Sequence, residues 1–456
     1  MQLLDLITIF IFALGIVIMG LSFSGKGRNM KSFFAAGGAV PWAMSGLSLF
    51  MGFFSAGTFV VWGSIAYSLG WIAISIQWTM AIAGFVVGFF IAPRWHKTSA
   101  LTVAEYITRR LGVNTQKTYT YLFLFISLFT TGSFLYPVAK IVEVSTGMPL
   151  DLCILLLGGF CIVYVAAGGL WAVVSTDVLQ FIILTAAVLI VVPLSFGRVG
   201  GVVNFIESIP ATYFNLVNGE YTIGFIIAFG VYNAIFLGGN WAYVQRYASV
   251  NSQSSARKVG FLFGGLYVVS AVLWMLPPMI YRIVNPSLST IDAEGAYLMM
   301  CKEVLPAGLL GLMLSGMVFA TASSLNATLN ISSGVVTNDI FKRLFPQSSD
   351  KTLMRVARIS TIIFGLLAII VALLIPLMGG IVNVVISVAA LTGVPLYLPI
   401  IWTLFSKRQT EYSVITTTLV SLGANAFFKF ITPLWGFGFN RAEEMIVGVA
   451  FPVFCL

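Results

Sequence analysis

The sequence predicts an all-α polytopic membrane protein of about 13 spans. Hydrophobic residues make up 59% of the 456 positions and charged residues only 9%, and mean hydropathy is +1.00. Such a chain is too apolar for a surface solvated by water. Apolar runs of about 20 residues recur without the alternation typical of β-strands. These observations exclude a soluble enzyme, a disordered chain and a transmembrane β-barrel.

Twelve apolar segments reach the length of a membrane-spanning helix. They are expected near 3–22, 41–68, 71–92, 118–146, 150–167, 172–196, 222–245, 258–284, 306–336, 355–376, 380–405 and 412–433. A thirteenth begins near 444 and reaches the last residue, Leu456, after too few residues for a full crossing. No small-residue cleavage site follows residues 3–22, so this segment is expected to be a retained first helix.

The net charge of +9 is explained by the positions of the basic residues along the chain. With the amino terminus outside, 18 of the 24 Lys and Arg, Arg246 among them, fall in loops on the inner side. This asymmetry predicts a multi-pass protein of the inner or plasma membrane with cytoplasmic basic loops and no nucleic acid partner. No Lys or Arg is expected in the middle of the membrane. The segment 102–111 is expected to be a short interfacial helix.

Two of the predicted spans contain residues that interrupt a helix. The second span has glycines and hydroxyls from Gly52 to Thr58, and the seventh has Gly238, Gly239 and Asn240. A helix broken inside the membrane is tolerated where it lines a site, whereas small residues also serve close helix packing. The two spans are five apart, as expected for a five-helix unit repeated with inverted topology, with halves near 41–196 and 222–405.

Polar groups in two other spans indicate an ion path. Thr321, Ser324 and Thr328 share one helix face with Ser323 beside it, and such hydroxyls bind hard cations or join helices. Asp177 lies well inside an apolar stretch, where a carboxylate usually marks an ion or proton path. The alternative for Asp177 is a first-turn acid stabilised by the helix dipole.

Several ordered motifs resemble the sodium:solute symporter family, which includes sodium-coupled sugar transporters and the proline and pantothenate carriers. The resemblance runs from about Lys31 to Arg408, and its stretches are Phe33 to Gly38 with Val40 to Trp42, Gly168 to Gln180, Gln245 with Arg246, Ser323 to Asn326, and Thr337 to Phe341. It implies a leucine-transporter-type fold with a 5+5 inverted-repeat core. An extra helix and basic loop would occupy 1–30, the ten-helix core 31–408, and additional C-terminal helices 409–456.

The resemblance also implies a sodium site. Its ligands would be the backbone carbonyls of Met51, Phe54 and Ala320 and the hydroxyls of Ser323 and Ser324. Asp177 and Asn326 match positions near that site that serve sodium access or a second sodium ion. Ala327 offers no side-chain ligand for a second ion, so one Na⁺ per cycle is expected.

For the solute, the resemblance points to a pocket poorer in polar groups than that of the sugar-transporting relatives. Their polar positions match Phe53, Gly57, Thr58, Gln77, Tyr267 and Ala389 here, and Phe236 matches an aromatic residue that stacks on the sugar. Hydrogen bonds would come from Thr58, Gln77, Tyr267, Asn233 and Asn240. For Gln77 and Asn233, interhelical hydrogen bonding is an equal alternative.

The predicted function is sodium-coupled import, by alternating access, of a small neutral organic solute such as a sugar or polyol. The protein would act as a monomer in the lipid bilayer, with Na⁺ as the coupled ion and no catalytic residues. Alternatives are a proton-coupled or sodium-coupled carrier of a carboxylate or amino acid, and a solute sensor on the same fold that does not transport.

Overall fold

The computed structural model describes residues 2–24, 40–100, 102–165 and 170–456, and throughout these ranges the chain forms helices and no strands. The predicted all-α class is therefore confirmed. The motif stretch from Phe33 to Gly38 lies outside the described residues, as do Gly168 and Gly169.

Seven helices of the described chain are long and apolar enough to cross a membrane, and a bent pair is an eighth. The seven are Ile72–Lys97 (α5, η3 and α6), Val113–Thr146 (α8), Asp177–Arg198 (within α10, Leu170–Arg198), Gln253–Val284 (α14), Asp350–Met378 (α18 and η7), Ile381–Trp402 (α19, η8 and α20) and Glu411–Trp435 (α21, η9 and η10). The bent pair is α12 (Ile223–Gly239) with α13 (Trp241–Ala248).

The remaining predicted spans are also helical. They correspond to α1 (Leu3–Ser24), α3 (Trp42–Met51) with α4 (Gly63–Leu69), α9 (Leu150–Val165), α16 (Leu309–Val335) and the short α22 (Arg441–Phe454). The total of about 13 spans stays a prediction, because these helices do not each reach the length and hydropathy of a crossing helix.

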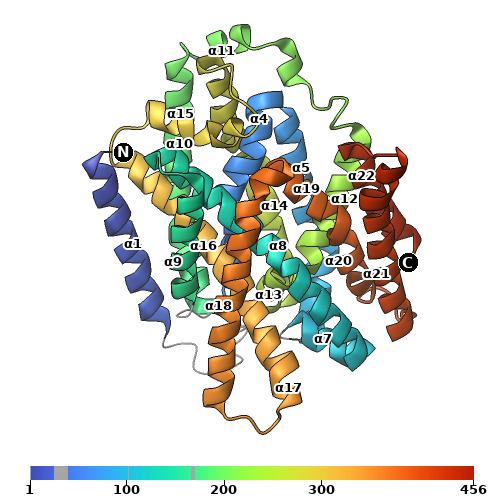
Figure 1. The fold of residues 1–456 in the computed structure, drawn as a ribbon. Helices are drawn as coiled ribbons and strands as arrows, with labels where there is room; N and C mark the ends of the chain where they lie inside the picture. The colour runs from blue at the N-terminus through green and yellow to red at the C-terminus, as the bar shows by residue number, and fades with distance from the viewer. Residues whose placement is uncertain (1, 25–39, 101, 166–169) are drawn as a thin grey trace.

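The helices form one bundle, with α1 along one side and α21 and α22 along the opposite side (Figure 1). Two short helices, α11 (Val202–Ser208) and α15 (Ala296–Val304), lie at one end, and α7 (Val103–Leu111) and α17 (Lys342–Leu344) lie at the other. A short helix is present where the interfacial helix was predicted, and Thr102 caps it by accepting a hydrogen bond from Glu105 N at 3.1 Å; its place at the membrane surface stays a prediction.

Helix α1 is held to the start of α16 by one carboxylate. Asp5 is 1% exposed, and its Oδ1 accepts hydrogen bonds from the backbone N–H groups of Gly308 (2.7 Å) and Gly311 (3.1 Å). These N–H groups belong to the N-cap residue and to the first turn of α16 (Leu309–Val335), where no intrahelical acceptor is available. The extra helix thus supplies the N-terminal cap of the helix that carries the hydroxyl cluster.

Both predicted helix breaks are present. Helix α3 ends at Met51, residues 52–55 are irregular, and helical structure resumes with the π-helical turn η2 (Thr58–Trp62) and α4. Between α12 and α13 the axis bends by 60° at Asn240. The Asn240 side chain accepts a hydrogen bond from Ala242 N at 3.0 Å and so starts α13.

Candidate solute and cation site

The break in the second span is joined to α16 by a hydrogen bond. The backbone N–H of Ala56 donates to Thr321 Oγ1 at 3.1 Å, and the Thr321 hydroxyl donates to Met317 O at 2.9 Å. Thr321 is fully buried. A polar group freed by the break thereby gains a partner from the helix opposite, as buried backbone requires.

Four of the predicted sodium-site residues line a single cavity of about 860 Å³ between α3, α16 and α10. They are Met51, Ala320, Ser324 and Asp177. Phe54 is 1% exposed and its ring stacks on Trp274, with ring centroids 4.8 Å apart. The side chains of Ser323 and Asn326 lie outside the described part of the chain.

The hydroxyl groups of α16 at this cavity form long hydrogen bonds to backbone carbonyls of the same helix. Ser324 Oγ is 3.5 Å from Ala320 O, at the limit of a hydrogen bond, and Thr328 Oγ1 donates to Ser324 O at 3.1 Å. A hard cation prefers such neutral oxygen ligands.

Asp177 lies two turns into α10, not in its first turn, so the helix-dipole alternative is wrong. Its side chain is 3% exposed and accepts a hydrogen bond from Ser48 Oγ at 2.5 Å, which joins α10 to α3. One turn further, Gln180 is 1% exposed, and its Oε1 has no hydrogen-bond partner among the described residues.

Arg246 corrects the prediction that basic residues stay in loops. It lies in α13, is 8% exposed, lines the same cavity as Asp177 and interacts with it electrostatically. Its backbone carbonyl accepts a hydrogen bond from Ser45 Oγ at 2.8 Å. Arg246 follows the break at Asn240 by less than two helical turns, and this spacing was the signal that it belongs to the broken span.

A second, larger cavity of about 1120 Å³ holds six of the seven predicted solute-binding residues. These are Phe53, Thr58, Gln77, Asn233, Phe236 and Tyr267, and the described lining contains no charged residue. Asn240 lines the adjoining cavity instead, and its Nδ2 lies 3.4 Å from the Tyr397 hydroxyl.

The polar side chains that line the larger cavity differ in their hydrogen-bond partners. Asn233 Nδ2 donates to Thr79 Oγ1 at 2.8 Å, which joins α12 to α5, so the predicted interhelical alternative is present for Asn233. Thr58 Oγ1 donates to Phe53 O and thereby ties the first turn after the break to the break itself. Gln77 is 3% exposed and lines the cavity.

Aromatic residues separate the two cavities. Phe236, Tyr243 and Tyr397 line both of them, together with Phe134. The Phe236 ring lies 5.5 Å from Tyr243 and 5.9 Å from Tyr397, centroid to centroid. Only Phe236 was predicted at this position. Tyr243 lies one turn after Asn240, so its position close to the helix break could have predicted that it lines the cavities.

The model of the sodium:solute symporter family matches residues 33–420. The chain belongs to the sodium:solute symporter family. The resemblance predicted from the motifs is confirmed, and the match extends beyond the predicted end at Arg408 into α21.

Two members of the family align with most of this chain. The sodium/glucose cotransporter of Vibrio parahaemolyticus is 28% identical over 94% of this chain and 86% of that protein. Sodium/glucose cotransporter 1 of Mus musculus is 25% identical over 89% of this chain and 68% of that protein. This sodium:solute symporter is accordingly a multi-pass transporter and not an enzyme, and Na⁺ is its coupled ion.

Solved structures share the fold. A substrate-bound, outward-open Na⁺-coupled sialic acid symporter superposes with a TM-score of 0.83 at 21% identity, covering 100% of this chain and 96% of that one. A closed nucleobase-cation-symport-1 family transporter gives 0.59 at 14% identity, covering 91% of each chain. The predicted leucine-transporter-type fold is thus confirmed.

Proposed function

We propose that this sodium-coupled symporter imports a small neutral organic solute, a sugar or polyol, by alternating access. The observation that carries the proposal is the cavity of about 1120 Å³, whose described lining is aromatic and hydroxylated and has no charge. Binding sites of this kind hold apolar faces against rings and orient hydroxyls with a few polar groups. Gln77, Thr58 and Tyr267 would supply those groups, and Phe236 would cover the solute.

The sodium site proposed from the resemblance comprises the carbonyls of Met51, Phe54 and Ala320 with the hydroxyls of Ser323 and Ser324. Its support is that Met51, Ala320 and Ser324 border one cavity where a helix break meets α16. Asp177 on the same cavity would form the sodium access path, and a second ion at Asn326 is not expected. One Na⁺ per cycle remains the proposal.

Several relatives have names that agree with a polyhydroxylated solute. They include sodium/glucose cotransporters and the sodium/myo-inositol cotransporter 2 of Sus scrofa, which is 27% identical over 92% of this chain. We propose the same chemical class here because glucose and inositol are neutral and rich in hydroxyls.

A carboxylate solute is the second candidate. Arg246 favours it, because a buried guanidinium beside the solute cavity can pair with an anion. Against it, Asp177 already interacts with Arg246.

The topology is also a proposal. The halves 41–196 and 222–405 would form the inverted repeats, supported by helix breaks at matching places in the second and seventh spans. The amino terminus would lie outside an inner or plasma membrane, with the end carrying α7 and α17 in the cytoplasm. The protein would act as a monomer.

Thermal stability of the purified protein tests the substrate class. The midpoint of unfolding is measured with sugars, polyols, amino acids and carboxylates, each in sodium chloride and in choline chloride. Ligand binding raises the midpoint by mass action. A sugar or polyol that stabilises only with sodium supports the proposal, whereas stabilisation by carboxylates alone would favour the second candidate. Stabilisation without regard to sodium would contradict both.

A further inference from the structure

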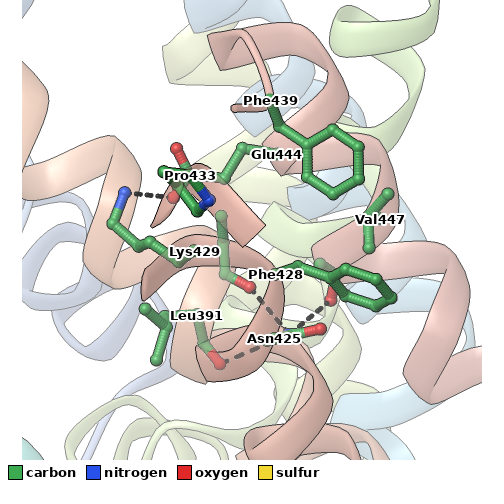
Figure 2. A pocket seen from close by; sticks show the side chains of 10 residues that line it. Leu391, Asn425, Phe428, Lys429, Pro433, Phe439, Glu444 and Val447 are labelled. Atoms are coloured by element: carbon green, nitrogen blue, oxygen red, sulfur yellow. Dashed lines mark hydrogen bonds and ion pairs between the residues drawn. The ribbon is translucent and has the colours of Figure 1, made fainter. Parts of the chain in front are cut away.

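Another cavity, of about 440 Å³, lies among the C-terminal helices and shares no lining residue with the solute cavity. It is enclosed by the π-helical turn η8 (Ala389–Gly393), by α21 (Glu411–Ala426) with η9 (Phe427–Ile431), and by α22 (Figure 2). Phe428 and Phe439 form part of its apolar wall. None of the functions proposed above uses it.

The cavity contains one charge of each sign. Lys429 and Glu444 form an ion pair across it, and Lys429 Nζ also donates to Ser387 Oγ at 2.8 Å. Figure 2 shows the two side chains reaching toward each other from η9 and α22. Their side chains are 23% and 20% exposed, so both charges remain within reach of a ligand.

An acceptor in the same lining is unsatisfied. Asn425 is 5% exposed, and its Nδ2 donates to the carbonyls of Ala390 (3.1 Å), Gly448 (3.3 Å) and Leu391 (3.4 Å). Its Oδ1 has no hydrogen-bond partner among the described residues. A buried acceptor without a donor is destabilising, so a ligand that brings an N–H group is favoured here.

The surface beside the cavity suits the membrane interface. Phe430, Leu434, Trp435 and Phe437, on and just after η9, are all more than half exposed. Exposed aromatic residues next to charged ones mark the level of lipid headgroups. A ligand would therefore reach the cavity from the lipid.

The cavity also lies directly behind the wall of the solute cavity. Ala390 and Leu391 of η8 line the C-terminal cavity, while Ala389, Thr392 and Gly393 of the same turn line the solute cavity. A ligand bound in the C-terminal cavity would therefore affect the shape of the solute cavity through η8.

We propose that this cavity binds the headgroup of an ethanolamine phospholipid. The phosphate would pair with Lys429, and the ammonium would donate to Glu444 and to Asn425 Oδ1. A balanced pair of charges matches a zwitterion better than an anionic headgroup, and a choline ammonium lacks N–H donors. The bound headgroup holds η8, and with it one wall of the solute cavity.

The test compares lipids on the delipidated, purified protein, without any transport assay. Phosphatidylethanolamine should raise the midpoint of unfolding by about 2 °C or more above phosphatidylcholine of the same acyl chains. The difference should vanish in the Lys429→Gln, Glu444→Gln double variant. It should persist in the Arg198→Gln, Glu303→Gln variant, which removes an ion pair of 3.4 Å whose two residues do not line this cavity.

Three results would overturn the proposal. They are equal stabilisation of the wild type by the two lipids, a lipid difference retained in the double variant, and full stabilisation by soluble glycerophosphoethanolamine, which would show that no lipid is required. If the double variant cannot be purified, Val447→Phe fills the cavity and leaves the ion pair in place. Retention of the lipid difference in that variant overturns the proposal equally.

Discussion

The hydroxyl residues of α16 beside the helix break make different contacts, which their spacing in the sequence does not distinguish. Thr321, Ser324 and Thr328 were predicted to share one helix face that either binds a cation or joins helices. In the structure, the Thr321 hydroxyl accepts a hydrogen bond from the backbone N–H of Ala56 in the second span, whereas Ser324 borders the cavity that Asp177 also lines. Helical spacing shows which hydroxyls share a face, but the partner of each hydroxyl depends on the helix packed against it.

Removal of the Thr321 hydroxyl tests its role. Thr321→Val should leave the N–H of Ala56 unpaired in a buried site and lower the free energy of unfolding by about 1–3 kcal/mol. Thr321→Ser, which keeps the acceptor, should lie near the wild type. Chemical denaturation in detergent measures both. Equal stability of the Val and Ser variants would show that the hydrogen bond has no role at the break.

Glu294 is a buried carboxylate outside the membrane-spanning helices. It lies in η5 (Asp292–Gly295), is 3% exposed, and accepts hydrogen bonds from Ile381 N at 3.0 Å and Tyr136 Oη at 2.8 Å. Burial raises the pKa of Glu294 above its ordinary value, although the two hydrogen bonds and nearby Lys140 oppose the rise and Glu143 adds to it.

The raised pKa of Glu294 predicts a pH dependence of stability. Because the folded state binds this proton more tightly than the unfolded state, the carboxyl favours folding in acid. That contribution is lost as the pH rises through the raised pKa. Thermal midpoints across the mildly acidic range should show this loss in the wild type and in the exposed control Glu207→Gln, but not in Glu294→Gln. If the thermal midpoint depends on pH in the same way in all three proteins, Glu294 does not contribute to the pH dependence.

At the scale of elements, the glycines serve both roles that the sequence left open. Gly52 marks the broken second span, whereas the glycines of α5, η3 and α14 bring two backbones together. A Cβ on Gly84 would lie 2.8 Å from Gly264 Cα, and one on Gly260 would lie 2.6 Å from Gly88 Cα. Sequence patterns could predict the breaks because polar residues accompany them, but not which glycines face a neighbouring helix.

The glycine contact predicts unequal effects at two nearby positions of α14. Gly260→Ala should force α14 away from η3 and lower the free energy of unfolding by about 1–3 kcal/mol. Gly265→Ala places its methyl group in open space and should be neutral or slightly stabilising. Denaturation of the two variants in the same detergent is the measurement. A Gly260→Ala protein as stable as Gly265→Ala would contradict the packing.

For the whole molecule, composition was enough to predict the helical membrane class, and ordered motifs were enough to predict the family. Both follow from local signals: apolar runs of spanning length, and residue types at fixed spacing. The position of Arg246 was not predictable in this way. Its burial beside Asp177 depends on the 60° bend between α12 and α13, which brings a segment counted as a loop into the cavity wall.

Coupling between the two cavities predicts reciprocal binding. They share aromatic walls and the break at Gly52, so occupancy of one should favour occupancy of the other. By linkage, sodium must strengthen solute binding by the same factor as solute strengthens sodium binding, typically 5–150-fold, about 1–3 kcal/mol. Calorimetric titration in both orders, with glucose or myo-inositol as probe, measures the two factors. Independent affinities would refute coupling through these cavities.

The most direct test of the account is equilibrium binding of radioactive sodium to the purified protein. The wild type should bind one Na⁺ per chain. The Ser323→Ala, Ser324→Ala double variant should lose that binding, whereas Ser315→Ala, whose hydroxyl donates to Gly311 O earlier in α16, should keep it. Unchanged sodium binding in the double variant would contradict a cation site between the broken second span and α16.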